Sequence, residues 1–163
     1  MKTILMIRHA KSQLTALNND FTKILTEKGI NDAKNIASLI SKKITTPDIM
    51  YTSPAYRALM TAKIFAEQLH YPENKLISDI NIYQKGLYFI KHLLPNIDNK
   101  INLVSIVGHN PDVAFLVSYY TGKGEYNVPT SSAICIDFYI NKWQEINDKK
   151  GEIRFFYHPK NNI

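Results

Sequence analysis

Two arginines and two histidines of this chain stand just after short apolar segments. Arg8 and His9 end the first of these segments, His109 follows a later one, and Arg57 comes shortly after another. An arginine offers a fork of donors that fits the oxygens of phosphate, and a histidine can act as nucleophile, acid or base near neutral pH. The chain has only three arginines and five histidines, so this grouping predicts a shared chemical role.

These four side chains would meet if the apolar segments are parallel strands of one sheet. The carboxyl ends of parallel strands lie along the same edge, where α/β proteins bind their ligands. Helices that start at this edge would add backbone N–H donors and a field that favours an anion. A cation in the first turn of a helix opposes that field, so Arg57 in such a position indicates a bound anion.

The chemistry that such a group supports is phosphoryl transfer. A phosphoryl group carries its charge on three oxygens, which two guanidinium forks can hold. A neutral histidine with one ring nitrogen fixed by a hydrogen bond can attack phosphorus through the other nitrogen. The second histidine can donate to the phosphoryl group as its charge grows. Water would then release phosphate from the phosphohistidine intermediate.

Each of these residues also has an ordinary explanation. His9 alone could be a capping or buried histidine, Arg57 a surface arginine of a helix, and His109 a turn residue. The remaining histidines have no such company, and we expect them to be structural or on the surface: His70, His92 and His158. No HxH, HExxH or CxxC spacing and no GxxxxGK[ST] loop occurs, so we expect neither a metal site nor a triphosphate-binding loop of these types.

The elements that must position these residues alternate between strand and helix. The expected strands lie at 2–7, 48–52, 101–107, 133–140 and 153–157. The expected helices are one at 27–43 capped by Thr26, and one at 87–94. Two more helices should start directly after strands, one with Ser53 as cap and Pro54 at its first position, the other with Asn110 as cap and Pro111 at its first position. The segment 101–107 is the most apolar, which predicts a central strand. The last two runs indicate an antiparallel hairpin at a sheet edge.

This order predicts a three-layer α/β/α sandwich, with a mostly parallel central sheet and an antiparallel edge. A length of 163 residues, with 45% hydrophobic and 21% charged residues, fits one domain that spans residues 1–163. No repeat or linker divides the chain. The sole cysteine, Cys135, excludes an internal disulfide, and its apolar neighbours predict a buried core side chain rather than a nucleophile.

The net charge of +6 comes mostly from lysines that are scattered along the chain. A nucleic-acid-binding protein gathers such charges on one face, so we expect no nucleic-acid partner, although the positive balance would draw anionic substrates toward a cleft. The apolar runs are too short to span a bilayer, and the first one ends too soon for a signal peptide. We therefore expect a cytoplasmic protein without a membrane partner, and a monomer.

Three segments of the chain resemble the histidine phosphatase superfamily. They are Ile7-Arg8-His9-Ala10, with alanine where the family usually has glycine, Ser53-Pro54-Ala55-Tyr56-Arg57-Ala58-Leu59-Met60-Thr61-Ala62, and Val107-Gly108-His109-Asn110-Pro111. The short length, together with the segments 25–29 and 129–133, is similar to the small SixA-type phosphohistidine phosphatases. The resemblance covers nearly the whole chain and implies a histidine phosphatase / phosphoglycerate mutase-like fold.

The resemblance also implies roles for individual residues. His9 would be the phosphorylated nucleophile, while Arg8, Arg57 and His109 would hold the phosphoryl group, with no metal or organic cofactor. Ser12 is a further candidate for substrate binding. Many larger relatives use an acidic general acid after the second helix. The nearest candidate here is Asp79, for which a surface turn aspartate is the better interpretation.

One motif departs from the pattern of the small phosphatases. They usually show Asp-x-x-Arg-Pro-Leu before the first helix, whereas this chain has Asp20-Phe21-Thr22-Lys23-Ile24-Leu25. A lysine keeps the charge of the arginine but loses the bidentate fork. We therefore do not expect Lys23 to reproduce the contacts of that arginine.

These observations predict a metal-independent phosphatase with a phosphohistidine intermediate, acting on phosphohistidine in a partner protein. Two alternatives stay open. One is a phosphatase for a small phosphate ester, or a mutase-like relative, and the other is a phosphate-binding module without turnover. The sequence does not identify the physiological substrate or the partner protein. A phosphohistidine has a nitrogen leaving group that can already be protonated, so the hypothesis of a phosphohistidine phosphatase does not require a strong protein acid.

Overall fold

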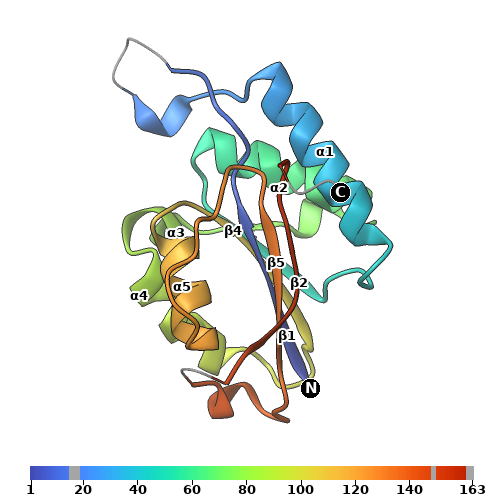
Figure 1. The fold of residues 1–163 in the computed structure, drawn as a ribbon, viewed down its shortest axis with the longest axis vertical. Coiled ribbons are helices and arrows are strands. Elements are labelled where there is room, and N and C mark those ends of the chain that lie inside the picture. Colours follow the sequence, from blue (N-terminus) through green and yellow to red (C-terminus); the bar gives the residue numbers. More distant parts are fainter. Residues whose placement is uncertain (15–18, 148–149, 161–163) are drawn as a thin grey trace.

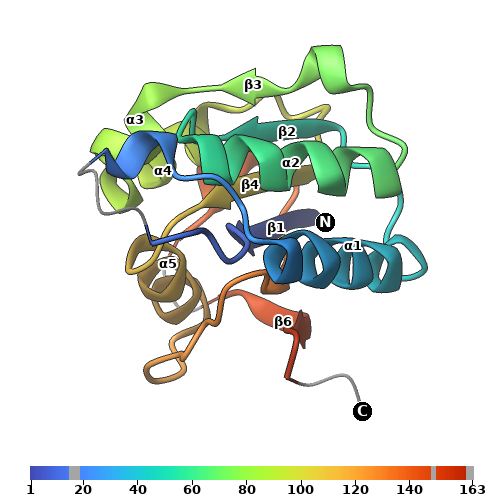
Figure 2. The same cartoon turned by 90° about the horizontal axis from the view of Figure 1, so that it is seen from above.

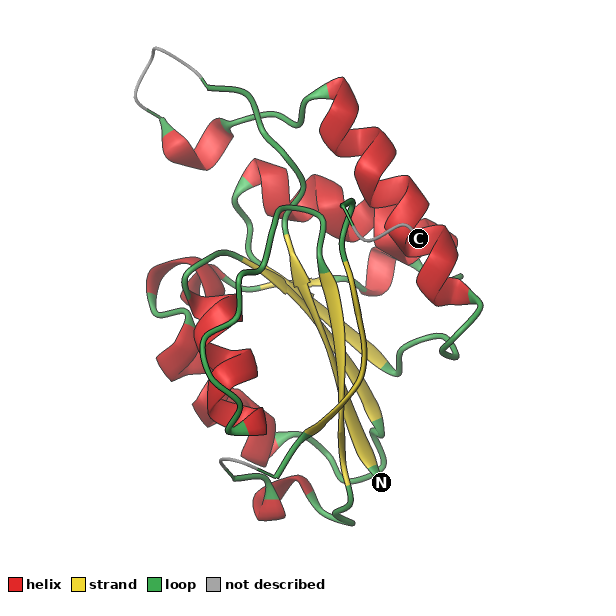
Figure 3. Cartoon of the chain, viewed as in Figure 1, coloured by secondary structure: helices red, strands yellow, loops and turns green. Residues whose placement is uncertain are grey.

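A six-stranded mixed sheet runs through the centre of the computed structural model, which describes residues 1–14, 19–147 and 150–160 (Figures 1 and 3). The strands are β1 (Lys2–Arg8), β2 (Ile49–Thr52), β3 (Ile77–Ser78), β4 (Leu103–Gly108), β5 (Ala133–Phe138) and β6 (Glu152–Tyr157). Their order across the sheet is β3-β2-β4-β1-β5-β6. The first four strands of that order are parallel, and β5 and β6 are antiparallel additions.

Helices cover both faces of the sheet, which confirms the predicted α/β/α layers (Figure 2). The helices are α1 (Glu27–Ser41), α2 (Tyr56–Gln68), α3 (Ile80–Gln84), α4 (Leu87–Leu93) and α5 (Asp112–Thr121). On one face α1 and α2 pack over Leu5 and Ile7 of β1, and on the other α3, α4 and α5 pack over Ile4 and Met6. Successive side chains of a strand point to opposite faces, so β1 supplies both cores.

One of the three predicted helix caps is confirmed and two are wrong. Thr26 caps α1, because its Oγ1 accepts from the Gly29 N–H at 2.9 Å. Helix α2 begins only at Tyr56, and α5 only at Asp112. The side chains of Ser53 and Asn110 are used elsewhere: Ser53 Oγ lies 2.7 Å from His109 Nε2, and Asn110 Nδ2 donates to the Val128 carbonyl at 3.0 Å.

The strand predictions hold in type and differ at the ends. The central position of 103–108 is confirmed, with β4 between β1 and β2. The antiparallel pairing of β5 and β6 is confirmed, but β5 also pairs with β1 and is buried along its whole length. Of these two strands only β6 lies at an edge of the sheet, and β3 forms the opposite edge. The segment 71–86, which lies outside all the predicted elements, contains β3 and α3.

The register of the sheet brings the predicted site residues to one edge. Arg8 is opposite Gly108 in the β1–β4 pair, and Thr52 is opposite Val107 in the β2–β4 pair. The residues that follow these three strands therefore leave the sheet side by side. Within the described ranges, no helix is both long and apolar enough to cross a membrane.

Candidate active site

His9 lies directly after β1 and is held by the backbone around it. Its N–H donates to the Gly108 carbonyl at 3.0 Å, and its carbonyl accepts from the Ser131 N–H at 3.1 Å. The ring Nδ1 lies 2.8 Å from the Ala10 carbonyl oxygen, which can only accept a hydrogen bond. In the neutral ring the proton is therefore on Nδ1, and the lone pair is on Nε2.

Arg57 faces this lone pair from the first turn of α2. Its Nε donates to His9 Nε2 at 3.3 Å, and only 7% of the residue is exposed. Thr61 links the two segments, because its Oγ1 donates to the Arg57 carbonyl at 2.6 Å and accepts from the Ala10 N–H at 2.9 Å. The start of α2 is thus tied to the residue after His9.

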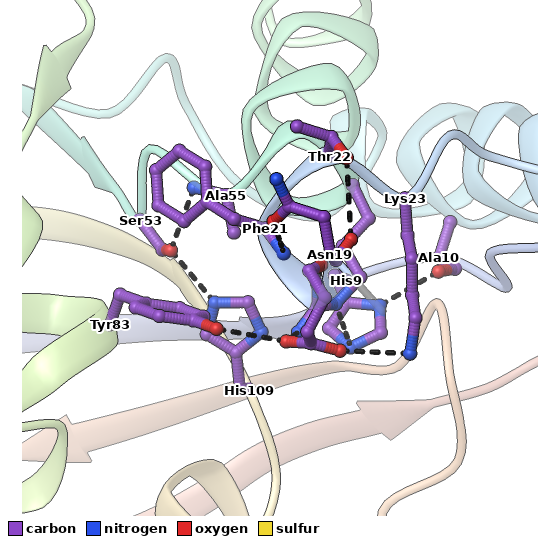
Figure 4. A network of polar contacts seen from close by, with 12 residues as sticks. His9, Ala10, Asn19, Phe21, Thr22, Lys23, Ser53, Ala55, Tyr83 and His109 are labelled. Atoms are coloured by element: carbon purple, nitrogen blue, oxygen red, sulfur yellow. Dashed lines mark hydrogen bonds and ion pairs between the residues drawn. The ribbon is translucent and has the colours of Figure 1, made fainter. Parts of the chain in front are cut away.

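His109 brings the second imidazole to the site from the end of β4. Its ring centroid lies 5.1 Å from that of His9, and the two planes are tilted by 54°. Its Nε2 lies 2.7 Å from Ser53 Oγ, and Ser53 Oγ also accepts from the Ala55 N–H at 3.2 Å (Figure 4). The Ser53 hydroxyl can donate to His109 Nε2, and with that assignment the ring proton of His109 is on Nδ1.

Two buried nitrogens at this edge of the sheet have no hydrogen-bond partner in the described part of the protein: Arg8 Nε and His109 Nδ1. Arg8 is anchored at its other side, where Nη1 donates to the Val128 carbonyl at 2.7 Å. The same carbonyl accepts from Asn110 Nδ2. A buried donor without a partner is costly, and a bound oxyanion would satisfy both nitrogens.

Asp20 belongs to the site although the sequence did not single it out as a site residue. It lies in the short 3-10 helix Asp20–Thr22, and Arg57 Nη2 donates to its Oδ2 at 2.8 Å while Arg57 Nη1 donates to its backbone carbonyl. Asp20 Oδ1 pairs with Lys23 Nζ at 2.9 Å, and Oδ2 accepts from the Tyr83 hydroxyl at 3.0 Å. Figure 4 shows Lys23, Tyr83 and both histidines around this network.

A sequence signal for Asp20 existed in the Asp-x-x-Lys spacing. It is the counterpart of the Asp-x-x-Arg that the small phosphatases show before their first helix. Lys23 engages Asp20, so its charge is used within the protein. For Tyr83 no signal existed, because it lies in the segment whose structure the sequence did not predict. Its ring packs edge-on against His109, with centroids 5.4 Å apart, and against Phe21 at 5.3 Å.

Both imidazoles are neutral over the physiological pH range. Burial lowers the pKa of His9 to about 4, and the charges of Arg57 and Arg8 act in the same direction. Burial also lowers the pKa of His109 to about 3, with help from His9 and Arg57. Contact with Lys23, and then with Arg57, holds the pKa of Asp20 well below its usual range. The site thus combines two neutral rings, two guanidinium groups and one ionised carboxylate.

The other predicted residues have contacts of their own. Ser12 pairs with Leu25 in an isolated antiparallel bridge. Asp79 is the N-cap of α3, where its Oδ1 accepts from the Asn81 N–H at 2.8 Å, as the interpretation of a turn aspartate requires. Cys135 is buried in β5, and burial raises its pKa to about 12, so the predicted core role is confirmed. Of the three other histidines, His70 and His92 are exposed.

No group of three or more His, Cys, Asp or Glu side chains that could hold a metal ion occurs within the described residues. The four predicted residues instead form a cationic site that contains two imidazole rings. Arg57 connects the histidines to Asp20, since the same guanidinium contacts His9 and Asp20. Such an arrangement can bind a tetrahedral oxyanion and offer it one nitrogen nucleophile, His9 Nε2.

Comparison with known sequences identifies relatives for the first half of the chain. The model of the histidine phosphatase superfamily (branch 1) matches residues 4–80. The 2,3-bisphosphoglycerate-dependent phosphoglycerate mutase of Erythrobacter litoralis (strain HTCC2594) is 37% identical over 82 residues, which are 46% of this chain and 36% of the mutase. The mutase of Nocardia farcinica (strain IFM 10152) is 37% identical over 65 residues, 38% of this chain and 26% of the mutase. The matches thus span about a third or less of these relatives.

Comparison with solved structures covers nearly the whole chain. The protein histidine phosphatase SixA in complex with tungstate is 18% identical, with a TM-score of 0.76 over 98% of both chains. A candidate phosphohistidine phosphatase SixA from Agrobacterium tumefaciens is 21% identical, with a TM-score of 0.79 over 97% of this chain and 98% of the other. A mycobacterial glucosyl-3-phosphoglycerate phosphatase is 13% identical, with a TM-score of 0.65 over 94% and 97%.

Sequence and structure agree with the resemblance seen in the three motifs. The matched residues 4–80 include Arg8, His9 and Arg57, and His109 joins them from the part of the chain beyond this match. Residues 4–80 carry the sequence pattern of the histidine phosphatase superfamily, and the whole chain has the fold of that superfamily.

Proposed function

We propose that this protein is a metal-independent phosphatase that forms a phosphohistidine at His9, and that its substrate is phosphohistidine in a partner protein. The observation that carries the proposal is the state of His9. Its Nδ1 is fixed to the Ala10 carbonyl, its Nε2 lone pair faces Arg57 at 3.3 Å, and its neutral ring lies 5.1 Å from that of His109. A neutral imidazole with one fixed and one open nitrogen is prepared for attack on phosphorus.

In the first step His9 Nε2 forms a bond to phosphorus while the bond from phosphorus to the substrate nitrogen breaks. The leaving imidazole keeps the electron pair of that bond. It departs as a neutral ring, with its proton on the nitrogen that was not bonded to phosphorus. Arg8, Arg57 and His109 Nδ1–H stabilise the charge on the three phosphoryl oxygens during transfer. The Ala10 carbonyl stabilises the positive charge that develops on the ring of His9.

In the second step water attacks the phosphorus on His9, and the bond from phosphorus to Nε2 breaks. The products are inorganic phosphate and the free imidazole of His9, with one proton of the water released. The neutral state of His9 is restored at once, because burial and the neighbouring guanidinium groups disfavour its cationic form.

A phosphohistidine substrate fits the contacts of Asp20 and Asp79. Lys23 and Arg57 hold Asp20 as an ion, and the side chain of Asp79 is used to cap α3. An alkoxide leaving group calls for a protonated acid beside it, whereas an imidazole leaving group does not. The SixA structures, whose fold this chain shares, support the same substrate class. We further propose that the protein acts in the cytoplasm, as a monomer and without an organic cofactor.

A phosphatase or mutase for a small phosphate ester is the second candidate. The observation that favours it is the 37% identity to a phosphoglycerate mutase over 82 residues, 46% of this chain and 36% of the mutase. The fold shared with a glucosyl-3-phosphoglycerate phosphatase is also consistent with it. A binding module without turnover is the third candidate, since the same cluster of donors would bind phosphate in either case.

The decisive experiment compares turnover of a phosphohistidine-bearing protein with that of p-nitrophenyl phosphate and 3-phosphoglycerate. We expect kcat/KM for the phosphohistidine protein to exceed that for 3-phosphoglycerate by at least about tenfold, because the alkoxide leaving group of that ester needs an acid. The p-nitrophenolate group leaves without an acid, so p-nitrophenyl phosphate only reports whether the protein turns over an ester at all. EDTA should leave the rate unchanged. Preference for 3-phosphoglycerate would support the second candidate, binding without phosphate release would support the third, and loss of activity in EDTA would contradict metal independence.

A further inference from the structure

We propose that Asp20 is an internal competitor of the substrate, whose carboxylate holds the part of Arg57 that a phosphoryl group must reach. Asp20 would then set the affinity of the site for oxyanions. The inference rests on the proposed function only in taking Arg57 as a phosphoryl-binding residue. Neither the three motifs nor the resemblance assigns such a role to Asp20.

The first support is the state of the Arg57 guanidinium. All three of its nitrogens are engaged within the protein: Nε with His9 Nε2, Nη1 with the Asp20 carbonyl and Nη2 with Asp20 Oδ2. A guanidinium is planar and rigid, so its donors point along fixed directions. A guanidinium has five N–H donors, of which Asp20 holds two, and an oxyanion can use those two only by replacing oxygen atoms of Asp20.

The second support is the position of His9 relative to the same guanidinium. Arg57 Nε lies 3.3 Å from His9 Nε2, the nitrogen that would carry the phosphoryl group. The Asp20 carboxylate binds Nη2 of the same planar group at 2.8 Å. A phosphoryl group on His9 and the Asp20 carboxylate are therefore negative groups next to one guanidinium. Two negative groups beside the same guanidinium repel each other, so binding of a phosphoryl group disfavours the Asp20–Arg57 contact and the reverse.

The third support is that Asp20 can give way at a small cost. The Asp20 side chain is 49% exposed, whereas that of Arg57 is 9% exposed. A half-exposed carboxylate keeps much of its hydration, and ion pairs of such groups contribute little net stability. Lys23 Nζ and the Tyr83 hydroxyl both bind the same carboxylate. Because these two contacts hold the carboxylate beside Arg57, loss of either one should make its displacement easier.

A different role for Asp20 makes the opposite prediction. If Asp20 only orients Arg57 for substrate, its removal frees the guanidinium and weakens the binding of oxyanions. If Asp20 competes with the substrate, its removal strengthens that binding. The sign of the change in affinity therefore separates the two roles, and it does so without any measurement of turnover.

The test is calorimetric titration of the protein with inorganic phosphate and with tungstate. For Asp20→Asn, which keeps the shape of the side chain and removes its charge, we expect a dissociation constant about tenfold lower than that of the wild type, the size of a modest ion pair. Asp20→Glu keeps the charge and should stay within about threefold of the wild type. Unchanged or weaker binding by Asp20→Asn would overturn the proposal.

The matched control is Asp32→Asn, which removes the same charge from an ion pair with Lys28 on α1. It reports the effect of net charge alone, and we expect a change of less than about twofold. If it tightens phosphate binding as much as Asp20→Asn, the proposal is wrong. Tyr83→Phe removes one contact of the Asp20 carboxylate and should give a smaller change in the same direction, which provides a second test should Asp20→Asn not fold.

These titrations are independent of the phosphatase assay. Tighter binding by Asp20→Asn in a protein that releases no phosphate would uphold the competition and refute the enzyme. Turnover of phosphohistidine with weaker binding by Asp20→Asn would uphold the enzyme and refute the competition.

Discussion

Two regions of the site are held in place by different means. The floor consists of residues at the ends of β1, β2 and β4: Arg8, His9, Ser53 and His109. The rim consists of Asp20, Lys23 and Tyr83. On the floor His9 has 9% exposure and Ser53 none, and backbone hydrogen bonds of the sheet fix His9. On the rim the Asp20 side chain is 49% exposed and is held by side-chain contacts.

This difference indicates that the floor and the rim contribute differently to the chemistry and to the affinity of the site. Sheet register determines where the imidazoles of His9 and His109 lie, so the floor has little freedom. The rim depends on ion pairs between partly exposed groups, which are weak and can rearrange. Arg57 belongs to both, because Nε contacts His9 and Nη2 contacts Asp20. Changes on the floor should therefore abolish chemistry, whereas changes on the rim should shift affinity.

The largest effect is expected for His9→Ala. Without Nε2 there is no covalent intermediate, and release of phosphate from a phosphohistidine protein should fall by at least about 10³-fold. Thermal unfolding should show that the variant is folded, and binding of inorganic phosphate should persist through the two arginines. Turnover near that of the wild type would show that His9 is not the nucleophile.

A large effect is also expected for Arg8→Lys. The lysine keeps the charge but loses the fork, of which Nη1 binds the Val128 carbonyl and the buried Nε has no partner among the described residues. We expect kcat to fall by about 10²–10³, the usual loss for one donor to a developing oxyanion. If KM rises while kcat is unchanged, Arg8 contributes only to ground-state binding.

A smaller effect is expected for Ser53→Ala, which acts through His109. Loss of the hydroxyl that faces His109 Nε2 should lower kcat by about tenfold, the value of one neutral hydrogen bond. A purely structural role would leave the ring of His109 unchanged. Nitrogen-15 spectra of the imidazoles provide that readout: we expect His109 to be protonated at Nδ1 in the wild type and at a mixture of both nitrogens in the variant.

A fall in pH is expected to have the smallest effect on function but a clear effect on stability. The pKa values of His9 and His109 in the folded protein are about 4 and about 3, against about 6.5 for a histidine in an unfolded chain. Between these values the unfolded state binds more protons, so the free energy of unfolding should decrease as the pH falls from about 6.5 to about 4. Above pH 7 the two histidines should add no pH dependence.

Denaturant titrations at several pH values measure this slope. His109→Asn should reduce it by up to about 1.4 kcal/mol per pH unit, the value for one proton. The control His92→Gln changes an exposed histidine and should leave the slope as it is. An unchanged slope in His109→Asn would show that folding does not lower the pKa of His109, in contradiction to a buried, neutral imidazole.

The sequence predicted the floor well and the rim poorly. Arg8, His9 and His109 follow apolar strands directly, so their positions depend on local pattern and on the parallel sheet alone. Tyr83 reaches the site from a segment with no clear periodicity, and Asp20 meets Arg57 across 37 positions of the chain. The two wrong caps have the same cause, because Ser53 and Asn110 are engaged by His109 and Val128 rather than by the helices that follow them.

The sequence by itself determined the layered fold, the four residues that gather at one edge of the sheet, and the order of the strands and helices other than β3 and α3. Apolar periodicity and the positions of polar residues after strands contain that information, since both act over a few residues. Only the tertiary structure decided which nitrogen of His9 is open, that Ser53 serves His109, and that Asp20 occupies Arg57. These features depend on contacts between distant segments and on burial, which no local pattern specifies.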